Sequence, residues 1–202
     1  KHFTEIVSLD QVNKQVTVQP GVIRDELNQY LKPFGLFFGP NTSTSNRCMI
    51  GGMVGNNSSG TTSIQYGVTR DKVISLKTIL ADGSEAEFGR VTEAQFHQKK
   101  QYNTFEASLY NNIYKELINK EIAEEITNNF PKPEIHRRNT GYAVDELLKA
   151  DVFGGQQPYF NMAELLCGSE GTLAFTTEIT IQLDELPPAY SAMVVTHYTS
   201  LE

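Results

Sequence analysis

The chain has 202 residues, of which 39% are apolar, and its formal net charge is −7, with acidic and basic residues interspersed. These values are typical of a globular chain of one domain or two small ones, and they argue against a nucleic-acid partner. No apolar run approaches the ~20 residues that cross a bilayer, so we expect no transmembrane segment. Cys48 and Cys167 lie far apart without metal-like spacing, which predicts two reduced thiols, no metal site and a cytoplasmic protein.

The first third of the chain has the pattern of two strands followed by a helix. Residues 4–9 and 15–19 are β-prone and joined by a polar segment, which predicts a hairpin. Apolar residues then recur at helical spacing over residues 22–34, and Gly35 is placed to end that helix.

The middle of the chain predicts a second hairpin and a long helix. Residues 73–80 form an apolar run, and Asp82-Gly83 marks a tight turn before the return strand at 85–88. Apolar residues form one stripe over residues 104–130, which predicts a single helix with a solvated opposite face. A short helix is expected over residues 144–149.

Toward the C-terminus the apolar residues alternate. Over residues 172–183 this alternation predicts one long strand with a single buried face, beginning at Leu173. Leu186-Pro187-Pro188 reads as a boundary, residues 192–198 resemble a new strand, and residues 199–202 match a capping box. We therefore divide the chain into residues 1–186 and a linker with the start of a further domain at 187–202.

The segment 39–60 is the strongest candidate for a ligand site. It is rich in glycine, serine and threonine, and Arg47 is its only charged residue. Glycines let the backbone approach a ligand closely, and bare N–H groups can hold a phosphate without lysine. A turn-rich surface loop would have the same composition, so composition alone leaves both interpretations open.

Several familiar sites are not present in the sequence. Gly51-Gly52-Met53-Val54-Gly55 lacks the Lys-Ser/Thr of a P-loop, and it lacks the Rossmann glycine spacing and the helical pattern that should follow. Ser169 is not in a nucleophile elbow, and the four histidines are scattered. Arg137-Arg138 could clamp an anion but also fits a solvated surface. The catalytic residues therefore stay unknown.

Several short motifs occur together in an order that carries a resemblance. The chain is similar to the FAD-linked oxidases and dehydrogenases related to vanillyl-alcohol oxidase and p-cresol methylhydroxylase, in the branch of the D-lactate, glycolate and D-2-hydroxyglutarate dehydrogenases. The motifs are Val18-Gln19-Pro20-Gly21-Val22, Pro40 with Ser43-Thr44, Ile50-Gly51-Gly52-Met53, Asn56-Asn57-Ser58-Ser59-Gly60, Tyr66-Gly67, Asn139-Thr140-Gly141-Tyr142 and Gly168-Ser169-Glu170-Gly171-Thr172-Leu173.

The resemblance implies an α+β fold in which an antiparallel β-sheet is flanked by helices, as in the second subdomain of an FAD-binding domain of the p-cresol methylhydroxylase type. It implies non-covalent FAD that the isolated chain binds weakly or not at all, because the first subdomain would lie upstream. The residues expected to face FAD are Pro40, Asn41, Thr42, Ser43, Thr44, Ile50, Gly51, Gly52, Gly55, Asn56, Asn57, Ser59, Gly60, Tyr66, Gly67, Glu170, Gly171 and Thr177.

The resemblance also implies a reaction and its partners. The full-length enzyme would oxidise a D-2-hydroxy acid to the 2-oxo acid and pass electrons to another acceptor, and the chain alone would be inactive. An exposed cofactor wall predicts a homo-oligomer, and the acceptor could hold a cytoplasmic protein at a membrane. Ala174 stands where relatives usually have glycine.

Two other functions stay open. A relative of UDP-N-acetylenolpyruvoylglucosamine reductase would use a similar flavin scaffold to reduce a sugar nucleotide. A non-catalytic interaction module would carry the glycine-rich segment as a flexible loop. The full-length sequence, or valine substitutions at Gly51 and Gly52, would separate these alternatives.

Overall fold

The computed structural model describes residues 2–132, 134–135, 141–190 and 192–200. Arg137-Arg138 and the first half of the motif 139–142 therefore lie outside the described residues, as does the end of the capping box 199–202. All structural statements below refer to the described part of the chain.

The centre of the fold is an antiparallel five-stranded sheet of order β1-β2-β8-β4-β5. Two further strand pairs are short, β3 with β9 and β6 with β7. The strands are β1 Ile6–Asp10, β2 Gln15–Val18, β3 Leu36–Phe37, β4 Val73–Ile79, β5 Glu85–Phe88, β6 Arg90–Val91, β7 Phe160–Asn161, β8 Phe175–Gln182 and β9 Asp184–Glu185.

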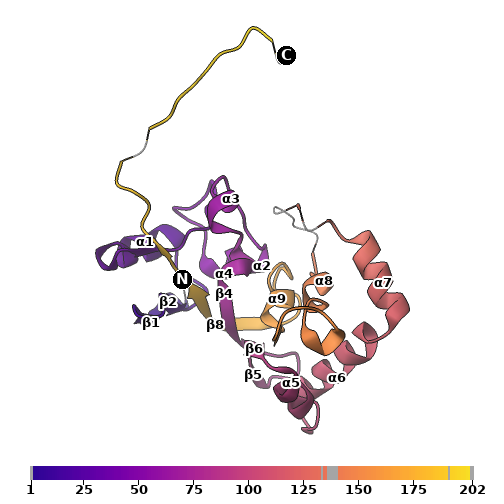
Figure 1. Ribbon diagram of the computed structural model, residues 1–202. Helices are drawn as coiled ribbons and strands as arrows, with labels where there is room; N and C mark the ends of the chain where they lie inside the picture. Colours follow the sequence, from indigo (N-terminus) through magenta and orange to yellow (C-terminus); the bar gives the residue numbers. More distant parts are fainter. Residues whose placement is uncertain (1, 133, 136–140, 191, 201–202) are drawn as a thin grey trace.

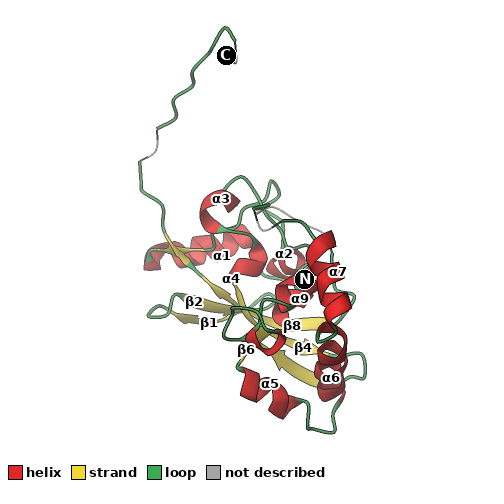
Figure 2. Ribbon diagram, turned by 45° about the vertical axis from the view of Figure 1, so that its right-hand side comes forward, coloured by secondary structure: helices red, strands yellow, loops and turns green. Residues whose placement is uncertain are grey.

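One face of the sheet is buried under helices and the other is polar. Val16, Leu76 and Ile179 are fully buried, whereas Thr17 and Thr180 share a side-chain hydrogen bond of 3.0 Å on the opposite face. Figure 2 shows α1, α2, α4 and α9 lying over the strands. The predicted α+β architecture, an antiparallel sheet flanked by helices, is confirmed, and the helices cover one face of the five-stranded sheet.

The helices are mostly short, and the chain order is visible in Figure 1. The same core continues into an aromatic group centred on Phe96 with Tyr110 and Phe160, which joins α5 and α6 to the sheet. The helices are α1 Arg24–Leu31, α2 Ile50–Gly55, α3 Ser63–Tyr66, α4 Thr69–Lys72, α5 Glu93–Lys99, α6 Phe105–Leu117, α7 Lys120–Asn129, α8 Val144–Leu147 and α9 Ala163–Leu166, with 3-10 turns at Lys32–Phe34 and Asp151–Phe153.

Both predicted hairpins are confirmed, and so is the first helix. Gly83 has a φ of 84°, and Leu80 N–H donates to Ser84 O at 2.8 Å across the turn. Gly35 has a φ of 72° and ends the helical segment in the left-handed conformation that glycine adopts without strain.

The single helix predicted over residues 104–130 is wrong, because the chain forms α6 and α7 with a break at Ile118-Asn119. The Asn119 side chain accepts the N–H of Glu121 at 3.0 Å, so it caps a new helix in place of continuing the old one. The apolar stripe passes through the break because both helices pack an apolar side inward.

The long strand predicted over residues 172–183 is also shorter than expected. β8 begins at Phe175, and its buried face starts only at Ile179, whereas Leu173 and Phe175 are exposed. β2 pairs with residues 179–182 alone, so the first half of β8 has a neighbouring strand, β4, on one side only.

The expected strand at 192–198 is not formed, and the described residues from 192 to 200 carry no helix or strand. Figure 1 shows this segment running away from the rest of the molecule. No helix within the described ranges is long and apolar enough to cross a membrane. The same ranges contain no cluster of His, Cys, Asp or Glu that could hold a metal ion.

Candidate functional site

An open groove lies where the end of β2, helix α2 and the start of β8 meet. Two adjoining cavities of about 220 Å³ and about 430 Å³ form it, and both are lined by Pro20, Gly51 and Phe175. Gly52 lines one end and Gly171 the other. The groove therefore joins two of the predicted cofactor motifs that are far apart in the sequence.

The Gly51-Gly52 segment is a helix, α2, where the sequence analysis expects a loop. Two hydrogen bonds start this helix: Ile50 N–H donates to Val22 O, and Gly51 N–H donates to Pro20 O, both at 2.9 Å. Met53 and Val54 are buried and anchor it to the core. Tertiary contacts thus outweigh the low helix propensity of glycine here.

The main-chain N–H groups of the predicted site divide into engaged and open donors. Those of Ile50, Gly51, Asn56 and Asn57 donate to main-chain carbonyls, so the expectation that the Gly51 N–H faces a ligand is wrong. Among the described residues, by contrast, no acceptor is found for the N–H groups of Asn41, Thr42, Ser43, Thr44, Gly52, Gly60 and Gly171.

Gly51 and Gly52 also differ in how much free space surrounds them. A Cβ on Gly51 would lie 2.5 Å from Pro20 Cβ, so this position has to be glycine for the fold. A Cβ on Gly52 or on Gly171 would meet no atom within 4 Å. These two residues therefore present bare backbone to the open groove.

The loop of Pro40 to Thr44 is held against the segment around Gly60. Pro40 is buried, and its carbonyl accepts the Nε–H of Arg24 at 3.0 Å. Gly60 packs so closely that a Cβ there would lie 1.9 Å from Asn41 O. The two motifs that the resemblance assigns to FAD are thus neighbours in space.

Tyr66 and Gly67 are the next predicted site residues along the chain. The Tyr66 ring packs edge-on against Phe37 at 5.0 Å between centroids, and Gly67 has a φ of 75°. Ser59 is half-buried in the adjoining turn. Tyr66 therefore has a packing role in addition to its predicted place near the cofactor.

At the other end of the groove, Glu170 and Gly171 form the turn into β8. Glu170 has a φ of 53° and donates its N–H to Gly55 O at 2.9 Å, which ties the turn to α2. Thr177 does not line the groove, because its hydroxyl donates to Lys77 O at 3.2 Å. Thr176 lines it instead, since successive strand residues point to opposite faces.

Several groove residues were not identified in the sequence analysis, among them Pro20, Phe175 and Thr176. Pro20 belongs to the Val-Gln-Pro-Gly motif, but nothing in that motif indicated that it would line the groove. Phe3 packs edge-on against Phe175 at 5.9 Å and extends this apolar rim. Nothing in the sequence pairs these two residues, which lie far apart along the chain.

Asn57 and Gly67 lie apart from the groove. Both line a different cavity, next to α4 and α8, that shares no lining residue with the groove. Asn57 is only 1% exposed. The predicted site residues therefore form one groove, one neighbouring loop cluster and one separate cavity.

The groove contains no charged side chain among its described lining residues, apart from what His2 can carry when protonated. A bound phosphate would thus meet backbone N–H groups and no lysine or arginine from this wall. Backbone amides can neutralise such a group by their dipoles, so the residues present fit a dinucleotide with a pyrophosphate.

Two titratable groups with raised pKa values lie in α9 and directly after it. Burial and the nearby Glu146 raise the pKa of the Glu164 carboxyl to about 7. Burial also raises the pKa of the Cys167 thiol to about 12. Both cysteines are free thiols, as predicted.

The fold of the chain has counterparts among solved structures. It is similar to solved structures of alkyldihydroxyacetonephosphate synthase in two crystal forms, each with a TM-score of 0.53, at 18% and 17% sequence identity. The match covers 93% of this chain and 22% of either solved chain. A model of the FAD binding domain family matches residues 1–89.

The sequence relatives specify the family further. The chain is 36% identical over 93% of its length to a D-2-hydroxyglutarate dehydrogenase from Escherichia coli, and 37% identical to one from Pantoea ananatis. A glycolate oxidase subunit from Bacillus subtilis is 42% identical over 41% of the chain. The chain is thus similar to FAD-linked oxidases and dehydrogenases, as its motifs indicated. It spans 17–18% of the length of these three relatives.

Proposed function

We propose that this chain supplies part of the FAD site of an oxidoreductase that oxidises a D-2-hydroxy acid to the 2-oxo acid. Residues 1–186 would be the second subdomain of the FAD-binding domain, and residues 187–202 would lead into a substrate domain. The family and the names of the relatives support the reaction class, since they include D-2-hydroxyglutarate dehydrogenases and a glycolate oxidase subunit.

The observation that carries the proposal is the bare N–H of Gly52 in a groove without lysine or arginine. A pyrophosphate needs donors, and open backbone N–H groups are the donors that this wall offers. Gly171 offers a second open N–H at the far end of the groove. The separation of the two ends suits an extended ligand better than a compact one.

When bound, FAD would accept the hydride from the substrate carbon. The chain's own contribution would be to bind and orient it. Gly52 and Gly171 would donate to the cofactor, the cluster of Asn41 to Thr44 with Gly60 would follow its outer part, and Phe175 would exclude water from one side. The catalytic base and the substrate clamps are expected on other parts of the full-length protein.

The test is a pair of measurements on the full-length protein. Titration with FAD, followed by flavin fluorescence, should show tight binding, and a screen of D-2-hydroxy acids should bleach the flavin absorbance with at least one of them. Failure to bind FAD would refute the cofactor assignment, and binding without bleaching by any D-2-hydroxy acid would refute the substrate class.

The 202-residue chain alone provides a second comparison. With one wall of the groove, it should bind FAD far more weakly than the full-length protein, and it should show no activity. Flavin that copurifies with the 202-residue chain would contradict the proposed division of the cofactor site between two subdomains.

Further parts of the proposal concern partners and place. We propose a separate electron acceptor, a cytoplasmic location and a homo-oligomer, each to be checked on the full-length protein by acceptor screening, fractionation and light scattering. The names of the relatives favour a hydroxy acid over a sugar nucleotide, and the engaged amides of α2 argue against a merely flexible loop.

A further inference from the structure

Arg24, the first residue of α1, contacts the chain on both sides of the loop 41–44. The main-chain N–H groups of this loop have no acceptor among the described residues. After the loop, Arg24 N–H donates to Cys48 O at 3.0 Å. Before the loop, the Arg24 side chain donates from Nε to Pro40 O at 3.0 Å and from Nη2 to Phe38 O at 3.2 Å. Both ends of the loop are therefore attached to the start of one helix.

The guanidinium of Arg24 is engaged at all three nitrogens. The side chain is 12% exposed, and its Nη1 donates to Asp25 Oδ1 at 3.0 Å. The other carboxylate oxygen of Asp25 accepts the hydroxyl of Ser45 at 3.0 Å, on the far side of the loop. A guanidinium is planar and its donors have fixed directions, so Pro40, Phe38 and Asp25 together determine where it lies. A lysine ammonium has a single nitrogen and cannot hold all three acceptors at once.

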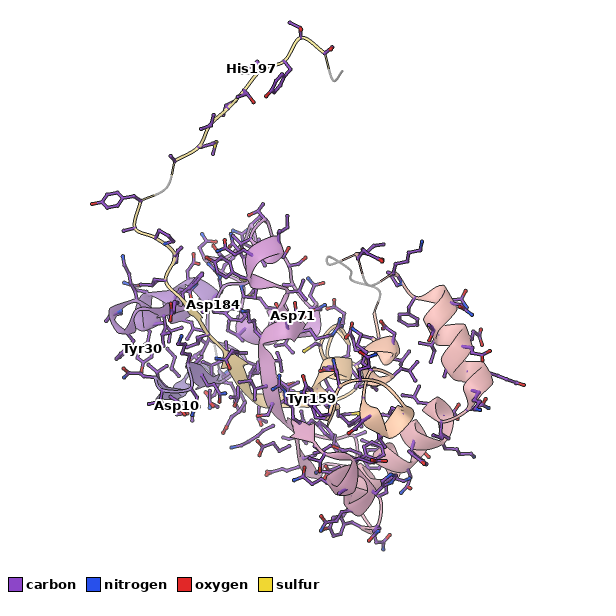
Figure 3. All side chains as sticks on the ribbon, viewed as in Figure 1. Asp10, Tyr30, Asp71, Tyr159, Asp184 and His197 are labelled. Carbon is purple, nitrogen blue, oxygen red and sulfur yellow. The ribbon has the colours of Figure 1, made fainter. Side chains whose placement is uncertain are left out.

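Other residues fix the two positions before Pro40. Asn28 exchanges two hydrogen bonds with the main chain of Phe38, at 2.7 Å and 3.2 Å. Gly39 packs so closely that a Cβ there would lie 2.5 Å from Oδ2 of Asp184, which is labelled in Figure 3. Pro40 is the last residue before the loop, and the donor found for its carbonyl within the described part of the chain is the Nε of the arginine.

The carbonyl of Pro40 and the N–H of Asn41 belong to one peptide unit. This unit is planar and trans, so a hydrogen bond that fixes the direction of the oxygen also fixes the direction of the N–H opposite to it. A donor on the oxygen also polarises the peptide, which makes the N–H a stronger donor. Arg24 therefore controls the first open donor of the loop from behind.

We propose that Arg24 is a positioning residue for the cofactor and acts through the peptide unit of Pro40 and Asn41. It would hold the Asn41 N–H in the direction in which FAD accepts it, so that less conformational entropy is lost on binding. The Arg24 side chain itself would not contact FAD, because its three nitrogens already donate within the protein. The inference rests on the function proposed above, since it takes the loop 41–44 as part of the FAD site.

The experiment titrates variants of the full-length protein, freed of flavin, with FAD and follows flavin fluorescence. Arg24→Met keeps a long side chain but removes its donors, and the Kd for FAD should rise at least about tenfold. Arg24→Lys keeps the charge without the planar set of donors, and the Kd should still rise at least about fivefold. Arg90→Met is the matched control, because it removes the same charge at an exposed position of β6 outside the groove, and it should leave the Kd within about twofold.

The rate at which iodoacetamide labels Cys48 reports on the loop in the absence of FAD. Its Sγ lies 3.2 Å from Thr42 Oγ1, so a loosened loop should expose the thiol. In the flavin-free Arg24→Met protein, Cys48 should be labelled at least about threefold faster than in the original. The fully buried Cys167 should stay unlabelled, because only general unfolding would expose both thiols.

The outcomes separate this inference from the function on which it rests. Absence of FAD binding by the original full-length protein would overturn both. If the original binds FAD tightly, unchanged affinity in Arg24→Met or in Arg24→Lys would overturn the positioning role alone. Weaker FAD binding without faster labelling of Cys48, or with Cys167 labelled as well, would also overturn it, because the loss would then not come from the loop.

Discussion

Gly52 offers the sharpest test of the cofactor groove, because the fold does not require it to be glycine. An added Cβ there would meet no atom within 4 Å, and the residue lies inside α2. Replacing a helical glycine by alanine stabilises a helix by up to about 1 kcal/mol. Gly52→Ala should therefore leave the thermal midpoint unchanged or raise it.

A larger side chain at this position should weaken FAD binding if the cofactor approaches the Gly52 N–H. Gly52→Val would place its side chain in the groove, where it would keep a phosphate from hydrogen-bond distance. We expect at least a tenfold rise in the Kd for FAD, which corresponds to about 1.4 kcal/mol. Fluorescence titration of the full-length protein with FAD measures this, and a circular dichroism melt measures stability in parallel.

Two variants complete the comparison. Gly51→Ala should destabilise the protein by about 1–3 kcal/mol, because its Cβ would lie 2.5 Å from Pro20 Cβ. Glu124→Val, at an exposed position of α7, adds the same side chain far from the groove and should leave FAD binding unchanged. If Gly52→Val binds FAD as tightly as the original protein, the cofactor does not occupy this groove.

Three further predictions concern stability and reactivity. The pKa of Glu164 is raised to about 7 in the folded protein, so between pH 4.5 and 7 the unfolded state loses this proton before the folded state does. The free energy of unfolding should therefore fall as the pH rises through this range, by at most about 3 kcal/mol. Glu164→Gln should make the free energy of unfolding, measured in urea, depend less on pH. Iodoacetamide should label the native protein at Cys48 and not at buried Cys167, as mass spectrometry would show. Asn119→Ala should cost about 1 kcal/mol in urea unfolding through the lost cap of α7.

Turn residues made much of the fold predictable from the sequence. Asp82-Gly83 and Gly35 mark backbone conformations that few other residues adopt, so both hairpins and the end of the first helical segment could be placed. The break at Asn119 could not, because the apolar stripe continues through it and neither glycine nor proline marks it. Asparagine as a cap is a weak signal beside a stripe of that length.

Helix α2 was missed for a different reason. Three of its six residues are glycine, and each disfavours a helix by close to 1 kcal/mol relative to alanine. Carbonyls from Pro20 and Val22 accept its first N–H groups, and Met53 is buried beneath it. Those contacts come from residues about thirty positions earlier in the chain, so no local pattern predicts them.

The motifs indicated which segments form the candidate site, but the sequence did not show which residue of each motif faces the groove. Gly51 and Gly52 are identical in the sequence, yet Pro20 packs against one and leaves the other open. Likewise Thr177 was expected at the cofactor, whereas Thr176 lines the groove because the strand alternates. A one-residue difference in direction is set by the register of β8 against its neighbours, which the sequence does not reveal.

The two glycines of α2 therefore satisfy two different requirements at once. Gly51 lets the helix approach the end of β2, so that its N–H reaches Pro20 O, and this contact orients the helix. Only when the helix is held in that orientation does the next N–H, on Gly52, point to open space with no acceptor in the described structure. The contact that removes one donor from the groove is thus what presents the other, and a rigid, pre-oriented donor loses less entropy on binding than a flexible loop would.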